Sequence, residues 1–301
     1  MKTNNSILAV GSIAYDTLKT SRGHRENSLG GSATFFGISA SHFTNTQLVG
    51  IVGNDFPQSD WDILHSYNID TENIQQVNGS TFRWGGEYSD DYSTRTTLFT
   101  ELGVFENFKP IIKNDYQQTE FLFLGNILPE LQISVFKQLS KPKCIITDTM
   151  NLWIDIAKDK LWEVINFTDI FLLNDEEAIQ LTGQEDLHLA ADELLKKGPK
   201  TVVIKQGSNG ALLATNREKI HIPIYPDADL VDPTGAGDSF AGGFMGYIAQ
   251  NGEDNLVQAV VTGSAIASFT VEGFGIEGIQ TATKDKIQKR INIINKLIQG
   301  V

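Results

Sequence analysis

A glycine-rich run in the last third of the chain, residues 230–249, contains residue types suited to phosphoryl transfer. Gly235, Ala236 and Gly237 precede large side chains spaced as on one helical face, so free amides of a turn are expected at a helix N-terminus. Such amides and the positive end of the helix dipole stabilise charge on a transferring phosphoryl group. Asp238 lies beside them, where its carboxylate can accept the proton of an attacking hydroxyl. Taken alone, the run fits a capped helix start with tightly packed glycines equally well.

A second carboxylate stands near the start of the chain, where residues 11–16 end the first apolar segment with Asp16. One carboxylate can accept hydrogen bonds from two adjacent hydroxyls, so Asp16 suits a polyol ligand. An Asp-Thr pair is also common in turns and caps. Gly30 and Gly31 follow and open a segment of small residues, which predicts a helix start.

Short apolar runs alternate with helix-like segments along most of the chain. The predicted strands are residues 7–11, 48–53, 121–125, 144–147, 170–173 and 201–205. The predicted helices are residues 131–139, 153–166, 176–181 with a Gly183 cap, and 186–197 with a Gly198 cap. This alternation predicts an α/β fold with a mainly parallel central sheet covered by helices on both faces.

Two segments interrupt the alternation. Residues 14–29 are polar, and residues 81–101 alternate bulky and polar side chains around a Ser-Asp-Asp turn, which predicts an antiparallel hairpin. A polar hairpin in a parallel α/β protein suits a lid over a site, or else a sheet edge or a dimer contact. We expect one domain spanning residues 1–301, with a lid formed by residues 14–29 and 78–103.

Composition argues against several classes of partner. The 301 residues include 24 Lys plus Arg against 37 Asp plus Glu, and the net charge of −13 would repel nucleic acid and anionic membranes. The single cysteine, Cys144, excludes an internal disulfide and a cysteine zinc cage, and the five histidines lack metal-ligand spacing. No apolar run resembles a signal sequence or reaches the roughly 18 residues of a membrane span. We therefore expect a cytoplasmic protein with no nucleic-acid or membrane partner.

Two widespread phosphate-binding motifs do not account for this chain. Residues 273–278 satisfy the GxGxxG pattern, but the few residues after them predict a helix rather than a second strand carrying an acid. The chain has no Gly-Lys dipeptide, which excludes a Walker-type loop. Phosphate binding is therefore expected at residues 235–237.

The stretch DPTGAGDSFAGG, residues 232–243, resembles the C-terminal signature of the PfkB, or ribokinase-like, carbohydrate kinases. The likeness extends over almost the whole chain. It implies that Asp238 is the catalytic base and that the amides of Gly235, Ala236 and Gly237 form an anion hole. It also implies that Asp232 and the Thr234 carbonyl lie near the monovalent-cation site found in many members.

On the acceptor side, other motifs follow in the order of the family. Asp16 resembles the acid that binds sugar hydroxyls, and Gly30 with Gly31 resembles the hinge between lid and core. Residues 49–55 resemble the VGxD element, which places Asn54 near the substrate.

On the nucleotide side, Asn174 and Glu177 match the family's NxxE motif, whose Glu orients water on Mg²⁺. The same spacing also forms a capping box, and both roles can coexist. Residues 202–211 resemble the nucleotide segment, in which Lys205 faces a phosphate or, alternatively, is a surface lysine on a hairpin. The turn of this segment contains Gly207 and Gly210. Further candidates at a strand end are Asp148 and Asn151.

The resemblance implies an ATP-dependent kinase that phosphorylates a hydroxyl, expected to be a primary hydroxyl, of a sugar or sugar-like molecule. The expected cofactors are ATP and Mg²⁺, with K⁺ in addition, and the expected assembly is a homodimer through the lid. Arg95 in the lid is expected to contact substrate.

Phe35 departs from the family pattern, because many members carry Asn at this position, five residues after the first hinge glycine. This change predicts a more apolar acceptor site and leaves a nucleoside kinase as an alternative. The aromatic residues available for stacking on a base are Phe35, Phe82, Trp84, Tyr88 and Tyr92. A non-catalytic ligand sensor is the alternative from another class.

Overall fold

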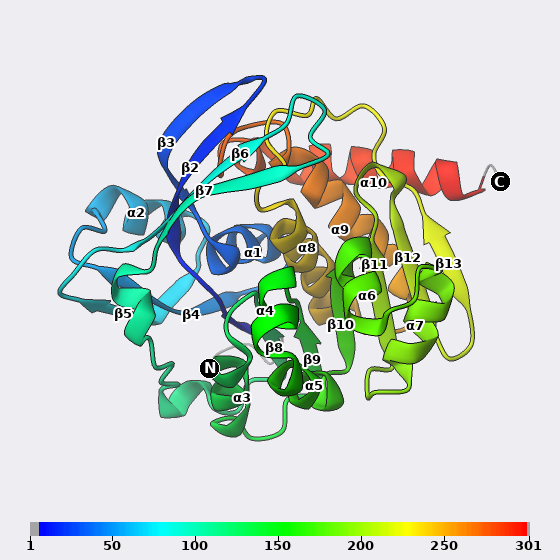
Figure 1. Ribbon diagram of the computed structural model, residues 1–301, viewed down its shortest axis with the longest axis horizontal. Coiled ribbons are helices and arrows are strands. Elements are labelled where there is room, and N and C mark those ends of the chain that lie inside the picture. Colours follow the sequence, from blue (N-terminus) through cyan, green and yellow to red (C-terminus); the bar gives the residue numbers. More distant parts are fainter. Residues whose placement is uncertain (1–5, 300–301) are drawn as a thin grey trace.

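The computed structural model describes residues 6–299 and is built around one nine-stranded sheet (Figure 1). The strand order is β13-β12-β11-β10-β9-β8-β1-β4-β5. The parallel strands are β1 (Ile7–Val10), β4 (Thr46–Gly53), β5 (Asp70–Val77), β8 (Phe121–Leu124), β9 (Cys144–Thr147), β10 (Ile170–Asn174) and β11 (Thr201–Lys205), and antiparallel β12 (Ala211–Thr215) and β13 (Lys219–Ile222) extend one edge. The central strands are apolar throughout because helices bury both of their faces.

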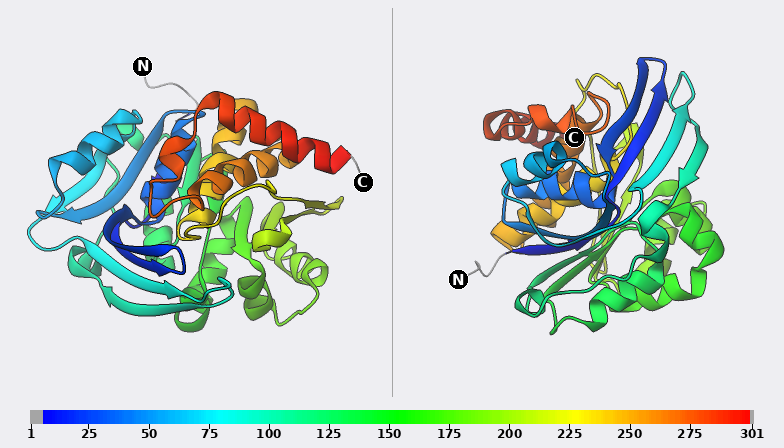
Figure 2. Two further views of the ribbon diagram at one scale, coloured as in Figure 1. Left: turned by 90° about the horizontal axis from the view of Figure 1, so that it is seen from above. Right: turned by 90° about the vertical axis from the view of Figure 1, so that its left-hand side faces the viewer.

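Helices cover the two faces of this sheet in separate layers (Figure 2). One layer consists of α1 (Ser32–Ser41), α2 (Gln58–Ser66), α8 (Ala236–Asn251), α9 (Leu256–Thr270) and α10 (Lys284–Gln299). The other consists of α3 (Pro129–Lys137), α4 (Asn151–Ile156), α5 (Lys158–Phe167), α6 (Asp175–Thr182) and α7 (Leu187–Leu195). The predicted α/β architecture is confirmed. No helix in the described part of the chain is long and apolar enough to cross a membrane.

Some predicted element boundaries were wrong. The helix predicted over residues 153–166 is two helices, because Ala157 leaves the helical conformation with φ −138° and ψ 30°. The cap predicted at Gly183 is confirmed by its left-handed conformation, whereas α7 ends before Gly198, with Lys196 as its C-cap.

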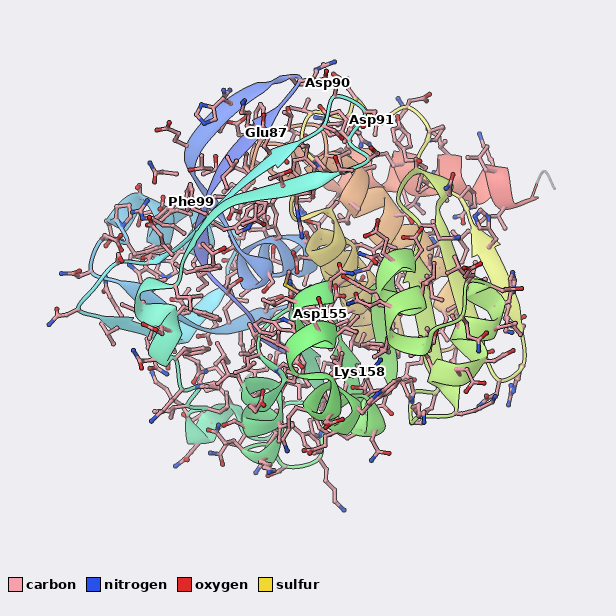
Figure 3. All side chains as sticks on the ribbon, in the orientation of Figure 1. Glu87, Asp90, Asp91, Phe99, Asp155 and Lys158 are labelled. Carbon is pink, nitrogen blue, oxygen red and sulfur yellow. The ribbon has the colours of Figure 1, made fainter. Side chains whose placement is uncertain are left out.

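A second sheet of order β3-β2-β6-β7 stands beside the central one. Its strands are β2 (Ala14–Thr20), β3 (Gly23–Gly30), β6 (Phe82–Tyr88) and β7 (Arg95–Glu101). The predicted hairpin is confirmed as β6 and β7, with the acidic turn residues Asp90 and Asp91 at its far end (Figure 3). We call these four strands the small sheet. Its outer strands β3 and β7 are open edges in the described structure, and the expected homodimer stays a prediction.

Helices α1 and α8 pack with their backbones in close contact. A Cβ on Gly242 of α8 would lie 2.5 Å from the Phe36 carbonyl oxygen and 2.6 Å from Cβ of Ser39, both on α1. On its other side, Phe36 stacks on Phe123 of β8 with ring centroids 3.9 Å apart. The N-termini of α1 and α8 are thereby held in a fixed relation to each other and to the sheet.

We expect Gly242→Ala to lower the stability of the protein. Alanine favours a helix over glycine by about 1 kcal/mol, but overpacking against the α1 backbone costs about 1–3 kcal/mol. A net loss of about 1 kcal/mol lowers Tm by about 2–4 °C for a chain of this size. Thermal unfolding followed by circular dichroism measures the change, and Gln250→Ala on the exposed side of α8 is the control. A higher Tm for Gly242→Ala would contradict the close packing.

Candidate active site

The candidate site lies where the carboxyl ends of parallel strands meet the N-termini of α1 and α8. Asp148 follows β9, Asn174 ends β10 and Lys205 ends β11, while Asp16 lies beyond β1 in the small sheet. In open α/β sheets, ligands bind along this edge. The topology thus brings residues from distant parts of the chain together.

The glycine turn before α8 has a geometry that only glycine accommodates. Gly235 is left-handed, with a φ of 76°, and a Cβ there would lie 2.4 Å from the ring of Phe35. The amide of Ala236 donates to the Pro233 carbonyl at 3.2 Å. Asp238 then lies in the first turn of α8, as the sequence predicts.

Asp238 is half-buried beside this turn. Burial and the negative charge of Asp148 raise the pKa of the Asp238 carboxyl to about 7, and the positive charge of Lys205 opposes that rise. A Cβ on the adjacent Gly237 would lie 3.2 Å from Nζ of Lys205. A carboxyl group whose pKa is near neutrality can both accept and release a proton at physiological pH.

Lys205 forms a largely buried ion pair with Asp148. Its Nζ lies 2.8 Å from Oδ2 and 3.1 Å from Oδ1 of that carboxylate, and the two side chains are 17% and 5% exposed. The negative charges of Asp148, Glu177 and Asp238 raise the pKa of Lys205 against the effect of burial. A surface lysine on a hairpin is therefore the wrong interpretation.

Gln132, which the sequence analysis did not identify, holds the backbone at Asp148, one member of this ion pair. Its Nε2 donates to the carbonyl oxygens of Gly125 at 2.9 Å and Asp148 at 3.2 Å. The side chain is 1% exposed and ties the carboxyl ends of β8 and β9 together. Its position N-terminal in α3 had no recognisable signal, because the contact depends on the order of strands in the sheet.

Asn174 and Glu177 form the predicted capping box at the start of α6. The Asn174 side chain accepts from the Glu177 amide at 2.7 Å, and Glu177 Oε2 accepts from the Asn174 amide at 2.8 Å. Burial, together with the charge of Asp148, raises the pKa of Glu177 to about 7, while Lys205 lowers it. Glu177 therefore belongs to the same electrostatic group as Lys205 and Asp148.

Asp16 is buried on the face of the small sheet that faces the core. Burial raises the pKa of its carboxyl to about 8, and the charges of Asp232 and Asp238 contribute to the increase. A Cβ on Gly30 would lie 2.0 Å from Asp16 Oδ2, so this glycine leaves room for the carboxylate. Gly31, with a φ of 89°, lies against the Ser12 carbonyl and leads into α1.

Asp232 is fully buried in the loop that leads to the glycine turn. Its Oδ1 accepts from the Thr234 amide at 3.0 Å, and its Oδ2 accepts from the Gly275 amide at 3.3 Å. Within residues 6–299 it has no lysine or arginine partner, and burial raises its pKa. A buried carboxylate without a cationic side chain suits a bound cation. The GxGxxG segment thus supplies a backbone donor to Asp232 through Gly275.

Three other predicted residues lie in segments that connect strands or helices. Asn54 is exposed, and its Oδ1 accepts from the Gly79 amide at 3.3 Å, at the base of the small sheet. Gly210 packs against the β13 backbone, where a Cβ would lie 2.3 Å from the Ile222 carbonyl oxygen. Gly207, with a φ of 54°, has open space at its Cβ position. The structure does not group Asn54 with the buried carboxylates.

Trp84 and Arg95 lie on the inner face of the small sheet. Trp84 pairs with Asp16 across β2 and β6, so both side chains point to the same face. The indole ring covers Gly86, where a Cβ would lie 2.1 Å from it. The Arg95 guanidinium lies 5.5 Å from the ring centroid, and its charge lowers the pKa of Glu177. On the outer face, Phe99, which is labelled in Figure 3, covers Gly85, where a Cβ would lie 2.4 Å from its ring.

Comparison with known proteins identifies the family of this chain. Residues 4–281 match the family model described as pfkB family carbohydrate kinase. Cytidine kinase of Thermococcus kodakarensis is 32% identical over 250 residues, which cover 80% of this chain and 88% of that protein.

Two solved structures share the fold over nearly the whole chain. The nucleoside kinase of Methanocaldococcus jannaschii has a TM-score of 0.79 at 23% identity, covering 97% of this chain and 99% of that one. An E. coli protein provisionally assigned as Ribokinase II, solved with ATP and Mg²⁺, has a TM-score of 0.80 at 20% identity, covering 96% and 99%. The chain therefore belongs to the pfkB family of carbohydrate kinases and is a kinase of a sugar or nucleoside.

Proposed function

We propose that this protein transfers the γ-phosphoryl group of ATP to a hydroxyl of a nucleoside. Charge–charge interactions link the acidic and basic residues of the site, with Asp238 common to both groups. The charges of Asp232 and Asp238 both act on Asp16, and those of Lys205 and Asp148 act on Asp238. A carboxylate between the two groups is placed to act between an acceptor beside Asp16 and a nucleotide beside Lys205.

The observation that carries the acceptor class is the position of Trp84. Its ring covers Gly86 on the same sheet face as Asp16. A stacking surface next to a carboxylate suits a ligand that joins a heteroaromatic base to a polyol. The names of two relatives, a cytidine kinase and a nucleoside kinase, support the same class.

The other candidate aromatics have different contacts. Phe35 is 1% exposed and packs against the glycine turn. Phe82 stacks on Phe105 with ring centroids 5.6 Å apart. The hydroxyls of Tyr88 and Tyr92 contact the segment before the glycine turn. Trp84 is therefore the aromatic residue that we assign to the base.

In the proposed reaction, the acceptor hydroxyl oxygen forms a bond to the γ-phosphorus while the bond from this phosphorus to the β–γ bridging oxygen breaks. The hydroxyl proton passes to Asp238, and ADP leaves. The amides of Gly235 and Gly237 and the positive end of α8 stabilise the charge on the transferring group, and the Ala236 amide joins them if it exchanges the Pro233 carbonyl for the phosphoryl oxygen. Lys205 binds the phosphates next to the glycine turn, because its Nζ would lie 3.2 Å from a Cβ on Gly237. Covering of the acceptor by the small sheet excludes water.

The residues on the nucleotide side also fit a magnesium ion. Glu177 and Asp148 offer carboxylate oxygens next to the Lys205 ammonium, and Mg²⁺ prefers oxygen ligands, held directly or through water. When bound, Mg²⁺ neutralises the charge of the triphosphate. Asp232 with the Thr234 carbonyl is the place we assign to a monovalent cation.

We expect Trp84→Leu to raise KM for the nucleoside much more than KM for ATP. Base–aromatic stacking contributes about 1–3 kcal/mol, which corresponds to about 5- to 150-fold in binding. ADP release with cytidine, inosine and ribose as separate acceptors measures the effect, and Phe99→Leu on the outer face is the matched control. Turnover with ribose alone would overturn the assignment to nucleosides.

We expect kcat/KM to fall about tenfold per pH unit as the pH drops below about 7, because Asp238 must be unprotonated to accept the hydroxyl proton and its pKa is raised to about 7. Asp238→Asn should bind ATP normally and lose at least ~10²-fold in kcat. Initial rates between pH 5.5 and 8.5, with ATP binding measured separately, test both expectations. Normal turnover by folded Asp238→Asn would rule out this base.

We expect K⁺ to raise the activity of the wild-type protein at constant ionic strength. A monovalent cation would neutralise the buried Asp232 carboxylate and so stabilise the segment that leads to Gly235. Rates in KCl are compared with rates in tetramethylammonium chloride, and Asp232→Asn should respond equally to both salts. Equal wild-type rates in the two salts would contradict a cation site here.

A further inference from the structure

We infer that hydroxyl groups of the small sheet, on Thr20, Tyr88 and Tyr92, position the glycine turn at residues 235–237. They would thereby couple covering of the acceptor to binding of the transferring phosphoryl group. The inference rests on the proposed function for the roles of the acceptor and of the turn. It concerns positioning residues rather than groups that touch the reacting atoms.

The three hydroxyls converge on one short segment, residues 231–234. Tyr88 Oη lies 3.1 Å from Thr234 Oγ1, immediately before Gly235. Tyr92 Oη donates to the Val231 carbonyl at 3.1 Å, and Thr20 Oγ1 donates to the same carbonyl at 3.0 Å. These residues come from β6, the hairpin turn and the end of β2, so the segment is held from three places in the small sheet.

The other ties of the segment to the core run through the loop that follows α9. Val231 and Asp232 both donate their amides to the Val271 carbonyl, at 2.7 and 3.2 Å, and Asp232 Oδ2 accepts from the Gly275 amide at 3.3 Å. The hydroxyl contacts therefore form a large part of what fixes the approach to Gly235. An exposed ion pair between Arg22 and Asp229 adds little, because such pairs contribute little to stability.

The conformation of Tyr92 supports a specific role. Its φ of 58° is left-handed, which is uncommon and unfavourable for a bulky residue. The turn keeps this conformation while the phenol packs near Tyr88, with ring centroids 6.3 Å apart, and reaches the Val231 carbonyl. Strain of this kind persists where the surrounding structure requires it.

The small sheet also contacts the second loop around Asp232. The Arg25 guanidinium lies 5.1 Å from the centroid of the Phe274 ring and forms an ion pair with Glu277. Gly275, between these two residues of the loop, donates its amide to Asp232. Both loops that hold the Asp232 carboxylate are therefore in contact with the small sheet, and a movement of the small sheet would change their positions. By thermodynamic linkage, acceptor and ATP should then strengthen each other's binding.

The first test needs no ligand. We compare hydrogen exchange of the wild-type protein with that of Tyr88→Phe/Tyr92→Phe, expecting exchange in residues 231–237 to be several-fold faster in the double variant. Tyr15→Phe is the matched control, because it removes a hydroxyl of the same small sheet that donates to Asp60 of α2 and not to residues 231–234. Unchanged exchange in the double variant, with Tm unaltered, overturns the inference.

The second test separates positioning from simple anchoring of the small sheet. With ATP and the better acceptor among cytidine, inosine and ribose, we expect kcat to fall about 3- to 10-fold, the effect of losing one or two hydrogen bonds. KM for ATP in the wild-type protein should fall as acceptor is raised, and this dependence should be lost in the double variant and kept in Tyr15→Phe.

A rise in acceptor KM alone, with kcat and the ATP dependence unchanged, overturns the inference. If none of the three acceptors is phosphorylated, the proposed acceptor class fails, while hydrogen exchange still decides the positioning role. The two ideas therefore fail by different measurements.

Discussion

The close approach of α1 and α8 is the constraint on which the site depends. Gly242 brings the two backbones into contact, and Phe35 fills the space against Gly235. Because each helix begins directly after a glycine segment, this one contact sets the distance between the acceptor side and the glycine turn. Densely packed interiors deform little. The positions of Asp16 and Asp238 thus follow from helix packing rather than from any bond between them.

This packing brings buried carboxyl groups close together, which is electrostatically unfavourable. Asp232 and Asp238 lie near enough to Asp16 to raise the pKa of its carboxyl, and Lys205 is engaged mainly with Asp148. Buried carboxylates near one another do not all ionise without compensation. A cationic ligand or a shared proton relieves the repulsion, so this crowding favours ligands that bring positive charge or hydroxyl donors.

The sequence predicted those parts of the fold that depend on local pattern. The apolar runs of β1, β9, β10 and β11 were predicted because both faces are buried, whereas edge strand β5, rich in polar residues, was not. The capping box at Asn174 was predicted because its signal spans four adjacent residues.

The Lys205–Asp148 pair and the contacts of Gln132 join distant segments through the strand order, which no local pattern contains. Asn54 was placed with the substrate residues, yet its contact is with Gly79.

The burial of the one cysteine has a practical consequence. Cys144 is the first residue of β9, the middle strand of the central sheet, and burial raises the pKa of its thiol well above the usual value. The thiolate is the reactive form, so this side chain should resist alkylating reagents while the protein is folded. A cysteine introduced at an exposed position such as Asp90 would then be the one reactive thiol. The native chain is thus a ready background for attaching a fluorophore to the hairpin tip, where movement of the small sheet can be followed by light emission.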